Sequence, residues 1–337
     1  MNRFDYTRAG TVQEAVQALA ADPAARFIAG GTNLVDLMKY NVERPGRLID
    51  ITRLPLDEIV QHEGGLRLGA LVPNATLAYD PLVTERYPLL ASALLAGASP
   101  QLRNAATTGG NLLQRTRCYY FYDEGTPCNK REPGSGCPAM TGINRIHAIL
   151  GASEKCIATH PSDMCVALAA LDATVQVEGP NGRRAIPFAE FHRLPGDEPE
   201  RDTTLRHGEI VLSVDLPDEE FSKHYTYLKL RDRLSYAFAL VSVAAALEMD
   251  GDTIRTARLA LGGVAHKPWR NAEAEARLQG KPATQESFRE AADVILAEAR
   301  PYTHNAFKVE LARRAIVRGL SQAAAGTPQS QTDKRIA

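Results

Sequence analysis

The chain is organised around the stretch from Thr107 to Asp163. This stretch opens with Thr-Thr-Gly-Gly-Asn-Leu (107–112), continues through a loop rich in Gly, Pro and charged residues, and closes with His-Pro-Ser-Asp (160–163). Glycine has no Cβ, so a glycine turn lets backbone N–H groups come close to a phosphate. The loop carries four cysteines, and cysteine sulfur is a common metal ligand. The stretch therefore predicts a dinucleotide site at its two ends and a metal centre in its middle.

The spacing of the four cysteines does not identify the metal. Cys118, Cys128, Cys137 and Cys156 are separated by nine, eight and eighteen residues, without the C-x-x-C pairs of zinc ribbons or bacterial ferredoxins. Free structural thiols prefer apolar cores, whereas these four stand beside Tyr, Pro, Lys, Asp and Gly. Metal ligation is therefore favoured, and spacing leaves both a structural zinc and a cubane iron–sulfur cluster open. Cys165 lies in an apolar helical run and is interpreted as a core residue outside the ligand set.

A second glycine turn, Gly-Gly-Thr-Asn, occupies residues 30–33. A short apolar strand (26–29) precedes it, a helix begins at Leu34, and residues 48–51 form a second apolar strand, so a small parallel βαβ unit is expected. Neither glycine turn matches the G-x-G-x-x-G or G-x-x-x-x-G-K-[ST] pattern, and alone each is more commonly a tight turn. Together the two turns could bind one pyrophosphate from two sides.

Length and composition describe an ordinary globular protein. The 337 residues are enough for two domains, and 23% charged residues with a net charge of −1 give no reason to expect nucleic acid or an anionic membrane as partner. No apolar run approaches the roughly 20 residues of a membrane helix. Residues 1–10 lack the apolar core of a signal peptide, so we expect no export signal on this chain. Export together with a partner that carries a signal stays open.

The rest of the chain alternates between strand and helix patterns. Strands are expected at 59–60 and 66–69 as a hairpin, and at 174–177, 184–187, 210–214, 225–230, 237–249 and 253–261. Helices are expected at 12–20, within 77–95, and at 164–171, 271–278, 285–299 and 306–320. A domain boundary is placed near Phe221, after the polar stretch 218–220, and a flexible polar tail begins at Ala323.

Two charged residues have ordinary structural explanations. Asp163 stands at a helix start, where a capping carboxylate is the default, and Lys229 alternates with Leu228 and Leu230 as a solvent-facing strand residue would. The eight histidines show no H-x-x-x-H arrangement, and no G-x-S-x-G nucleophile elbow is present. The sequence therefore offers no candidate site for hydrolysis.

These motifs together resemble the FAD-binding (medium) subunits of the molybdenum hydroxylases, the family of xanthine dehydrogenase and carbon monoxide dehydrogenase. The resemblance covers almost the whole chain: Ala-Gly-Gly-Thr-Asn-Leu (29–34) and Thr-Thr-Gly-Gly-Asn-Leu (107–112) are similar to the two FAD loops. Tyr-Leu-Lys (227–229), followed by 239–244, resembles the start of the family's C-terminal domain. The resemblance implies that a lysine here approaches the isoalloxazine ring, which moves Lys229 from solvent-facing to flavin-adjacent.

The resemblance also implies a fold and a set of site residues. The fold is α+β, with a two-part FAD-binding domain (1–220, divided at 55/56) that combines a small parallel βαβ unit with a mixed or antiparallel sheet and helices. A C-terminal domain (221–325) with a three-stranded antiparallel sheet and a helix bundle follows, and then a flexible tail (326–337). The implied FAD contacts are Ile28, Ala29, Gly30, Gly31, Thr32, Asn33, Leu34, Thr107, Thr108, Gly109, Gly110, Asn111, Asp163, Val211 and Lys229.

One segment departs from the usual family pattern. Residues 115–159, the cysteine loop, are an insertion between the second FAD loop and Ser162-Asp163. The resemblance implies that the aspartate of this pair helps to hold the sugar-phosphate part of the flavin. The loop's Cys-Tyr-Tyr-Phe-Tyr, Pro-Cys-Asn-Lys-Arg and Gly-Ser-Gly-Cys-Pro segments resemble the flavin subunit of bacterial periplasmic aldehyde oxidoreductases, which binds FAD and a [4Fe–4S] cluster. The resemblance thus favours a cubane cluster over zinc, with Cys118, Cys128, Cys137 and Cys156 as its ligands.

The implied assembly is an αβγ heterotrimer. A large subunit with a molybdenum–pterin cofactor would oxidise an aldehyde, a small subunit with [2Fe–2S] clusters would pass electrons to FAD on this chain, and an external acceptor would receive them. No catalytic acid or base is expected on this chain. The implied compartment is the periplasm, reached by co-export with a signal-bearing partner, with the cytoplasm as the alternative.

Three alternatives are retained. The flavin subunit of 4-hydroxybenzoyl-CoA reductase also carries an inserted cluster, but its cysteines are spaced differently. A stand-alone flavoenzyme such as UDP-N-acetylenolpyruvylglucosamine reductase would need its own substrate residues, and the C-terminal domain that contains Lys229 argues against it. A non-redox scaffold with zinc in the loop and empty glycine turns would be colourless, whereas the redox alternatives predict a yellow-brown protein.

Overall fold

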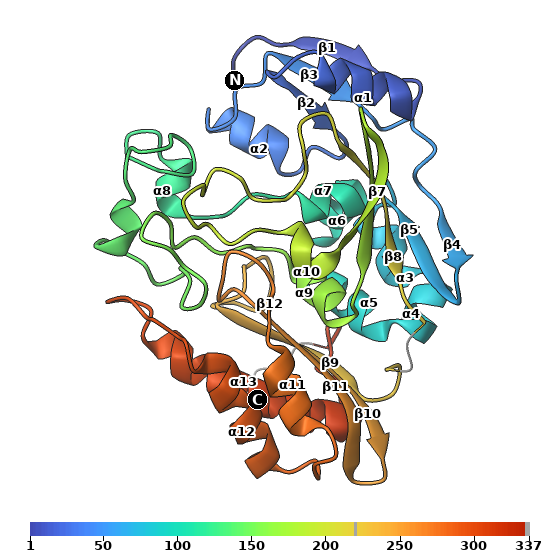
Figure 1. The fold of residues 1–337 in the computed structure, drawn as a ribbon, viewed down its shortest axis with the longest axis vertical. Helices are drawn as coiled ribbons and strands as arrows, with labels where there is room; N and C mark the ends of the chain where they lie inside the picture. The colour runs from blue at the N-terminus through green and yellow to red at the C-terminus, as the bar shows by residue number, and fades with distance from the viewer. Residues whose placement is uncertain (219–220, 334–337) are drawn as a thin grey trace.

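The computed structural model describes residues 1–218 and 221–333. It contains three sheets with helices packed around them, and Figure 1 shows the three-stranded sheet at one end and the C-terminal helices at the other. The α+β class expected from the sequence is confirmed. Residues 219–220, in the polar stretch before the expected boundary at Phe221, lie outside the described residues, as do residues 334–337 of the expected tail.

The first sheet is parallel, with strand order β1-β3-β2. Strands β2 (Ala25–Ile28) and β3 (Arg47–Asp50) flank α2 (Leu34–Lys39), which is the expected βαβ unit. Helix α1 (Val12–Ala20) begins at Thr11, whose hydroxyl accepts the N–H of Glu14 at 3.1 Å. Strand β1 (Asp5–Arg8) was not predicted, because its four residues are all exposed and show no apolar pattern.

The second sheet is antiparallel and has the order β4-β5-β8-β6-β7. The expected hairpin is β4 (Ile59–His62) and β5 (Gly65–Gly69), and its turn places Glu63 and Gly64 at positive φ. The other strands are β6 (Thr174–Gly179), β7 (Gly182–Pro187) and β8 (Ile210–Leu216). The helices of this region are α3 (Asn74–Tyr79), α4 (Pro81–Arg86), α5 (Pro88–Ala96), α6 (Pro100–Ala105), α7 (Thr108–Leu112), α9 (Asp163–Ala170) and α10 (Phe188–Phe191).

The third sheet lies between two layers of helices. Its order is β12-β11-β10-β9, from β9 (Tyr225–Leu230), β10 (Val241–Asp250), β11 (Thr253–Gly262) and the two-residue β12 (Trp269–Arg270), which was not among the three predicted strands. One layer consists of helices α11 (Ala272–Leu278), α12 (Gln285–Leu296) and α13 (Phe307–Ala324). The other layer consists of α5 and α9, which also pack with the second sheet's region and contact the third sheet. Because helices cover both faces, every residue of β10 from Val241 to Leu247 is buried, and all of them except Ser242 are apolar.

The cysteine loop is mostly irregular and is anchored on both sides. It contains only α8 (Tyr119–Tyr122) and the 3₁₀ turn η1 (Pro138–Met140) as helical segments, and it projects beside the rest of the fold in Figure 1. Its later part docks onto the C-terminal region: the fully buried Lys308 donates to the His147 carbonyl at 2.8 Å, and Asn305 donates to the carbonyls of His147 and Ala148. Helix α13 and the residues just before it therefore supply hydrogen-bond donors to carbonyl groups of the loop backbone.

The tail corrects one expectation. Helix α13 continues to Ala324. The residues after it were expected to form a flexible tail, but those up to 333 lie against β9. Gln329 accepts the N–H of Lys229 at 3.0 Å and Gln331 donates to the Tyr227 carbonyl at 3.0 Å. These contacts pair backbone groups of an edge strand, which explains why a polar segment is ordered there. Among the described residues, none of the helices combines the length and apolar character that a membrane crossing requires.

Candidate functional site

The two glycine turns meet, as the two-sided pyrophosphate hypothesis requires. A Cβ added to Gly30 would lie 1.7 Å from the carbonyl oxygen of Ala105, just before the second turn, so only glycine permits this approach. Asn33 accepts the N–H of Arg115 at 2.9 Å, which ties the first turn to the end of the second. The buried Nδ2 of Asn33 has no hydrogen-bond partner among the described residues, as expected of a donor that awaits an acceptor. This arrangement fits FAD.

The second turn is joined to the start of α9. Thr107 caps α7 by accepting the N–H of Gly110, and Thr108 donates to the Val72 carbonyl at 3.0 Å. Asn111 accepts a hydrogen bond from Ser162 at 2.6 Å, and Ser162 in turn caps α9. The two ends of the stretch 107–163 are therefore in direct contact, although the cysteine loop separates them in sequence.

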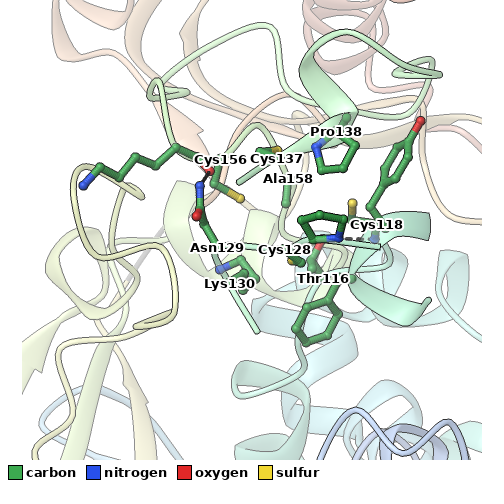
Figure 2. Close-up of a pocket in the computed structure, with 14 residues that line it drawn as sticks. Thr116, Cys118, Cys128, Asn129, Lys130, Cys137, Pro138, Cys156 and Ala158 are labelled. Carbon is green, nitrogen blue, oxygen red and sulfur yellow. Dashed lines mark hydrogen bonds between the residues drawn. The ribbon is translucent and has the colours of Figure 1, made fainter. Parts of the chain in front are cut away.

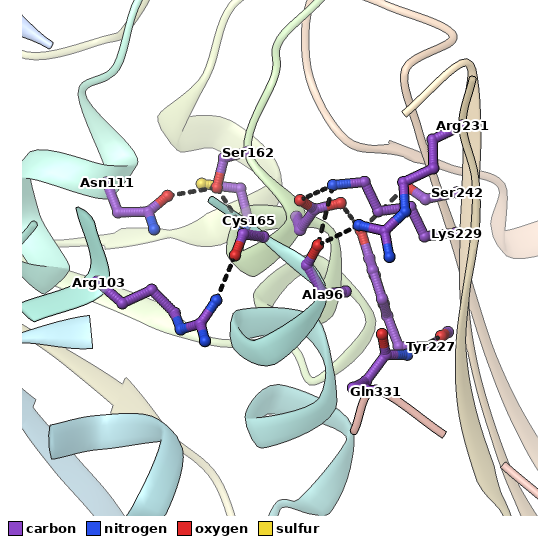
Figure 3. A network of polar contacts seen from close by, with 12 residues as sticks. Ala96, Arg103, Asn111, Ser162, Cys165, Tyr227, Lys229, Arg231, Ser242 and Gln331 are labelled. Atoms are coloured by element: carbon purple, nitrogen blue, oxygen red, sulfur yellow. Dashed lines mark hydrogen bonds and ion pairs between the residues drawn. The ribbon is translucent and has the colours of Figure 1, made fainter. Parts of the chain in front are cut away.

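The default explanation of Asp163 as a helix cap is wrong, because Ser162 caps α9. Asp163 forms a buried ion pair with Lys229. Figure 3 shows Lys229 reaching across from β9, with its Nζ 2.7 Å from Asp163 Oδ2 and 3.1 Å from the Ala96 carbonyl. The Tyr227 hydroxyl donates to Asp163 Oδ1 at 2.7 Å and lies 3.0 Å from Ser242 Oγ. We call this network the α9 seam. Lys229 is 5% exposed, so the solvent-facing interpretation of its strand position is wrong.

The four cysteines of the loop line one pocket. Figure 2 shows Cys118, Cys128, Cys137 and Cys156 around a common hollow, and Cys165 is not among the residues that line it. The four are free thiols, three of them buried and Cys137 half-buried. The grouping agrees with the predicted ligand set and with the exclusion of Cys165, which lies in the core of the second region.

Burial favours the protonated form of three of these thiols, Cys118, Cys137 and Cys156, while no metal is bound. It raises the pKa of Cys118 to about 12 and that of Cys156 to about 11, and it also raises the pKa of Cys137. Four thiolates in one apolar hollow would repel one another, and a cation removes this cost by coordinating them. The donor set therefore suits a metal centre that holds four thiolates, which is true of both a cubane cluster and zinc.

Asn129 holds the cysteine segments in place and was missed by the sequence analysis. Its Oδ1 accepts the N–H of Gly136 at 2.8 Å and its Nδ2 donates to the Lys155 carbonyl at 2.9 Å. It thereby connects the neighbours of Cys128, Cys137 and Cys156. Its position directly after a cysteine was the only available indication, and no spacing rule uses it.

Charges under the loop are paired. The buried Lys130 lies 2.5 Å from Asp202, which also binds Arg115 at 2.8 Å. Although burial opposes ionisation, the Lys130 and Arg115 charges hold the pKa of Asp202 below its ordinary value. His147 is the other residue that the sequence analysis missed: its Nε2 is 3.0 Å from Cys118 Sγ, and burial lowers its pKa to about 4.

Most of the remaining predicted FAD contacts lie at the glycine turns, and Val211 lies on β8. Ile28, Ala29, Thr32 and Leu34 lie in or beside the first turn and are half-buried, so they surround the place where the turns meet. Gly31 has a φ of 69°, and Gly109 packs against Ala70. Val211 is 4% exposed and packs into the core on β8, the strand that contacts α7 of the second turn, and its contact with FAD stays a prediction.

Comparison with known proteins agrees with this geometry. The profile of the FAD binding domain in molybdopterin dehydrogenase matches residues 2–219, and that of the CO dehydrogenase flavoprotein C-terminal domain matches residues 224–323. The chain is 52% identical to the aldehyde oxidoreductase FAD-binding subunit of Escherichia coli, over 96% of this chain and 99% of that protein.

Two solved structures are similar along their whole length. A chain of carbon monoxide dehydrogenase from Hydrogenophaga pseudoflava, in a form lacking the Mo-pyranopterin moiety of the molybdenum cofactor, superposes with a TM-score of 0.76 and 28% identity, covering 96% of this chain and 98% of that one. A chain of quinoline 2-oxidoreductase from Pseudomonas putida 86 superposes with a TM-score of 0.75 and 27% identity, covering 97% and 98%.

Proposed function

This chain belongs to the family of FAD-binding subunits of the molybdenum hydroxylases, and we propose that it is the FAD- and [4Fe–4S]-containing electron-transfer subunit of a molybdenum-dependent aldehyde oxidoreductase. Members of this family are subunits of oxidoreductases. The observation that carries the cluster assignment is the single pocket lined by Cys118, Cys128, Cys137 and Cys156. The aldehyde assignment is supported by the 52% identity to the Escherichia coli aldehyde oxidoreductase subunit.

In the proposed αβγ complex the oxidation takes place on a partner subunit. A large subunit with a molybdenum–pterin cofactor would convert RCHO and H₂O to RCOOH, releasing two protons and two electrons. A small subunit with [2Fe–2S] clusters would carry the electrons to this chain, which would deliver them to an external acceptor. When bound, FAD supplies one- and two-electron transfer and the cluster supplies one-electron transfer.

The residues of this chain hold and orient those groups. The turns at 30–33 and 107–111 would bind the pyrophosphate through backbone N–H groups and the free amide of Asn33. The α9 seam would present the Asp163–Lys229 pair to the flavin, with the carboxylate oriented by the Tyr227 hydroxyl. The four thiols would ligate the cluster, and the Nε2 of His147 stands at hydrogen-bond distance from the Cys118 sulfur.

Two other functions are compatible with parts of this site. A 4-hydroxybenzoyl-CoA reductase subunit would use the same cofactors, but its inserted cysteines are spaced differently. A zinc-loop scaffold is favoured by one observation, namely that four buried thiols satisfy tetrahedral zinc as well as iron. The meeting of the two glycine turns and the unpartnered Asn33 amide argue against empty turns.

We further propose that the complex reaches the periplasm by co-export, with a partner subunit carrying the signal. This proposal rests on the resemblance of the cysteine loop to periplasmic enzymes. Cell fractionation after co-expression with the partner subunits should place this chain in the periplasm only when the partner's signal is intact. Periplasmic recovery of this chain without any partner would contradict co-export.

Metal and sulfide analysis tests the cluster. The chain, purified anaerobically with its flavin, should contain about four iron and four sulfide per FAD and show flavin and iron–sulfur absorption. Cys128→Ser should lose the iron and sulfide, whereas the control Cys165→Ser should keep both, because Cys165 lies outside the pocket. Zinc without sulfide that Cys128→Ser removes, or an absence of flavin bands, would instead favour the scaffold.

A further inference from the structure

A second group of metal-ligating side chains lies outside the cysteine pocket. The ligand atoms of His160, Cys165 and His192 all lie within 4.8 Å of one another. The two imidazole rings are 4.3 Å apart between centroids, at an interplanar angle of 54°. His160 precedes α9, Cys165 lies on α9 and His192 directly follows α10, so three separate segments bring these side chains together.

The hydrogen bonding of His192 prepares one nitrogen for a metal. Its Nε2 lies 2.9 Å from the carbonyl oxygen of Leu112, and because a carbonyl only accepts, Nε2 carries the proton. Nδ1 therefore presents its lone pair, and within the described part of the chain it has no hydrogen-bond partner. A histidine that donates from one ring nitrogen to a carbonyl while the other is free is the usual arrangement of a metal ligand.

His160 lacks partners on both ring nitrogens. Neither Nδ1 nor Nε2 forms a hydrogen bond with any described residue, although both atoms are buried. In the neutral ring one nitrogen carries the proton and the other presents a lone pair that no described residue meets, so this lone pair is available to a metal. The backbone of His160 is held by its N–H bond to Ala265 at 3.0 Å, so the ring is not free to swing away with its segment.

Burial determines the protonation states of the three side chains. Burial lowers the pKa of His192 to about 4 and holds the pKa of His160 well below its ordinary value, so both rings are neutral and keep their lone pairs. Burial raises the pKa of Cys165 to about 12, and a bound metal would displace its proton. Asp202 acts electrostatically on both imidazoles, but it is already paired with Lys130 and Arg115, and Lys267 opposes it at His192.

We propose that His160, Cys165 and His192 bind a zinc ion, separate from the four-cysteine centre. Two imidazole nitrogens and one thiolate are ligands that zinc prefers, and a water would complete the tetrahedron. His160 is only half-buried, which provides a route for the ion. The ion would brace the end of α7, through the bond from His192 to Leu112, against α9 and the segment after α10. The site would thus stabilise the second glycine turn from behind.

The test is zinc analysis and zinc-edge X-ray absorption on the full chain, loaded with iron and equilibrated with zinc chloride before desalting. We expect about one zinc per chain, coordinated by nitrogen at about 2.0 Å and a single sulfur at about 2.3 Å. Cys165→Ala and His192→Leu should each lose this zinc while iron per FAD stays unchanged. His147→Gln, a buried histidine beside the other centre, is the matched control and should keep the zinc.

Two results would overturn the proposal. One is zinc near background in the wild-type chain, which would leave ordered water as the partner of these nitrogens. The other is zinc with only sulfur neighbours that persists in Cys165→Ala and disappears in Cys128→Ser, because that ion would occupy the four-cysteine pocket. The second result would also contradict the cluster, whereas the first would leave it untouched. The absorption measurement on the wild-type chain decides the matter even where a variant fails to fold.

Discussion

The cysteine loop and the α9 seam both bury reactive side chains, but they are assembled in opposite ways. The loop takes its four sulfurs from 39 consecutive residues and has little regular structure around them, with a small apolar cluster beneath. The seam takes Asp163 from α9 and Lys229 from β9, 66 residues later, inside the packed interface of a helix and a sheet.

This difference in assembly indicates which of the two sites depends on a bound cofactor for its stability. Side chains of the seam are paired with one another, so the seam is stable as a protein structure by itself. The thiols of the loop would gain their main partner from the proposed metal centre, and the loop backbone relies on contacts such as those of Asn129 and Lys308. We therefore expect damage to the seam to lower global stability, and damage to the loop to remain local.

The largest effect is expected when one side of the seam is removed. Lys229→Met leaves the Asp163 carboxylate buried and unpaired, which should lower the free energy of unfolding by about 3–5 kcal/mol. Urea denaturation of the purified protein measures this. The double variant Lys229→Met/Asp163→Asn removes the stranded charge and should recover part of the loss. Equal losses in the single and double variants would show that the ion pair is not the cause.

A smaller and local effect is expected in the loop. Asn129→Ala leaves the Gly136 N–H and the Lys155 carbonyl without their partner, at a cost of about 1–3 kcal/mol. Hydrogen exchange should rise within residues 115–159 and stay unchanged in β9–β11. Asn129→Asp keeps the acceptor for Gly136 and should lie between wild type and Ala. Faster hydrogen exchange throughout the protein in Asn129→Ala would show that damage to the loop is not local, in contrast to what we expect.

A buried histidine outside both regions makes the stability depend on pH. Burial, aided by the Lys130 charge, lowers the pKa of His266 to about 3. Between this value and the ordinary 6.5 the unfolded chain binds the proton that the folded chain refuses, so stability falls as pH decreases through that window. The slope from this residue is at most about 1.4 kcal/mol per pH unit.

In unfolding curves recorded across the window, His266→Leu should lower the pH slope of stability by the contribution of this residue, while the buried His147, His160 and His192 keep theirs. The exposed His207 provides the control, because His207→Leu should leave the slope as it is. An unchanged slope in His266→Leu would mean that His266 is protonated in the folded protein.

The smallest effect is expected on the cluster potential. If the His147 Nε2–H donates to the Cys118 sulfur, it stabilises the more negative reduced state, and His147→Phe should lower the potential by about 40 mV, equivalent to about 1 kcal/mol. Redox titration followed by electron paramagnetic resonance measures the shift. His147→Gln retains an N–H donor and should restore most of the wild-type value. A shift of the same size in both variants would point to packing instead.

Local features of the site were predictable because the chemistry lies in neighbouring residues. Thr11 caps α1 as expected, the βαβ unit surrounds the first glycine turn, and the four cysteines of one loop share one pocket. Strand β1 and the ordered tail were missed, because exposed polar segments carry no periodic pattern and gain their order only from the strands they pair with.

The sequence by itself determined the family, the two glycine turns and the grouping of four cysteines in one loop, because each of these features lies in a short stretch. The tertiary structure alone decided that Lys229 is buried against Asp163, that Asn129 and His147 support the thiols, and that His160, Cys165 and His192 converge. The physical reason is that periodicity reports which face of one element is apolar. It does not report which distant element will cover that face, and the partners of buried polar groups are chosen by that packing.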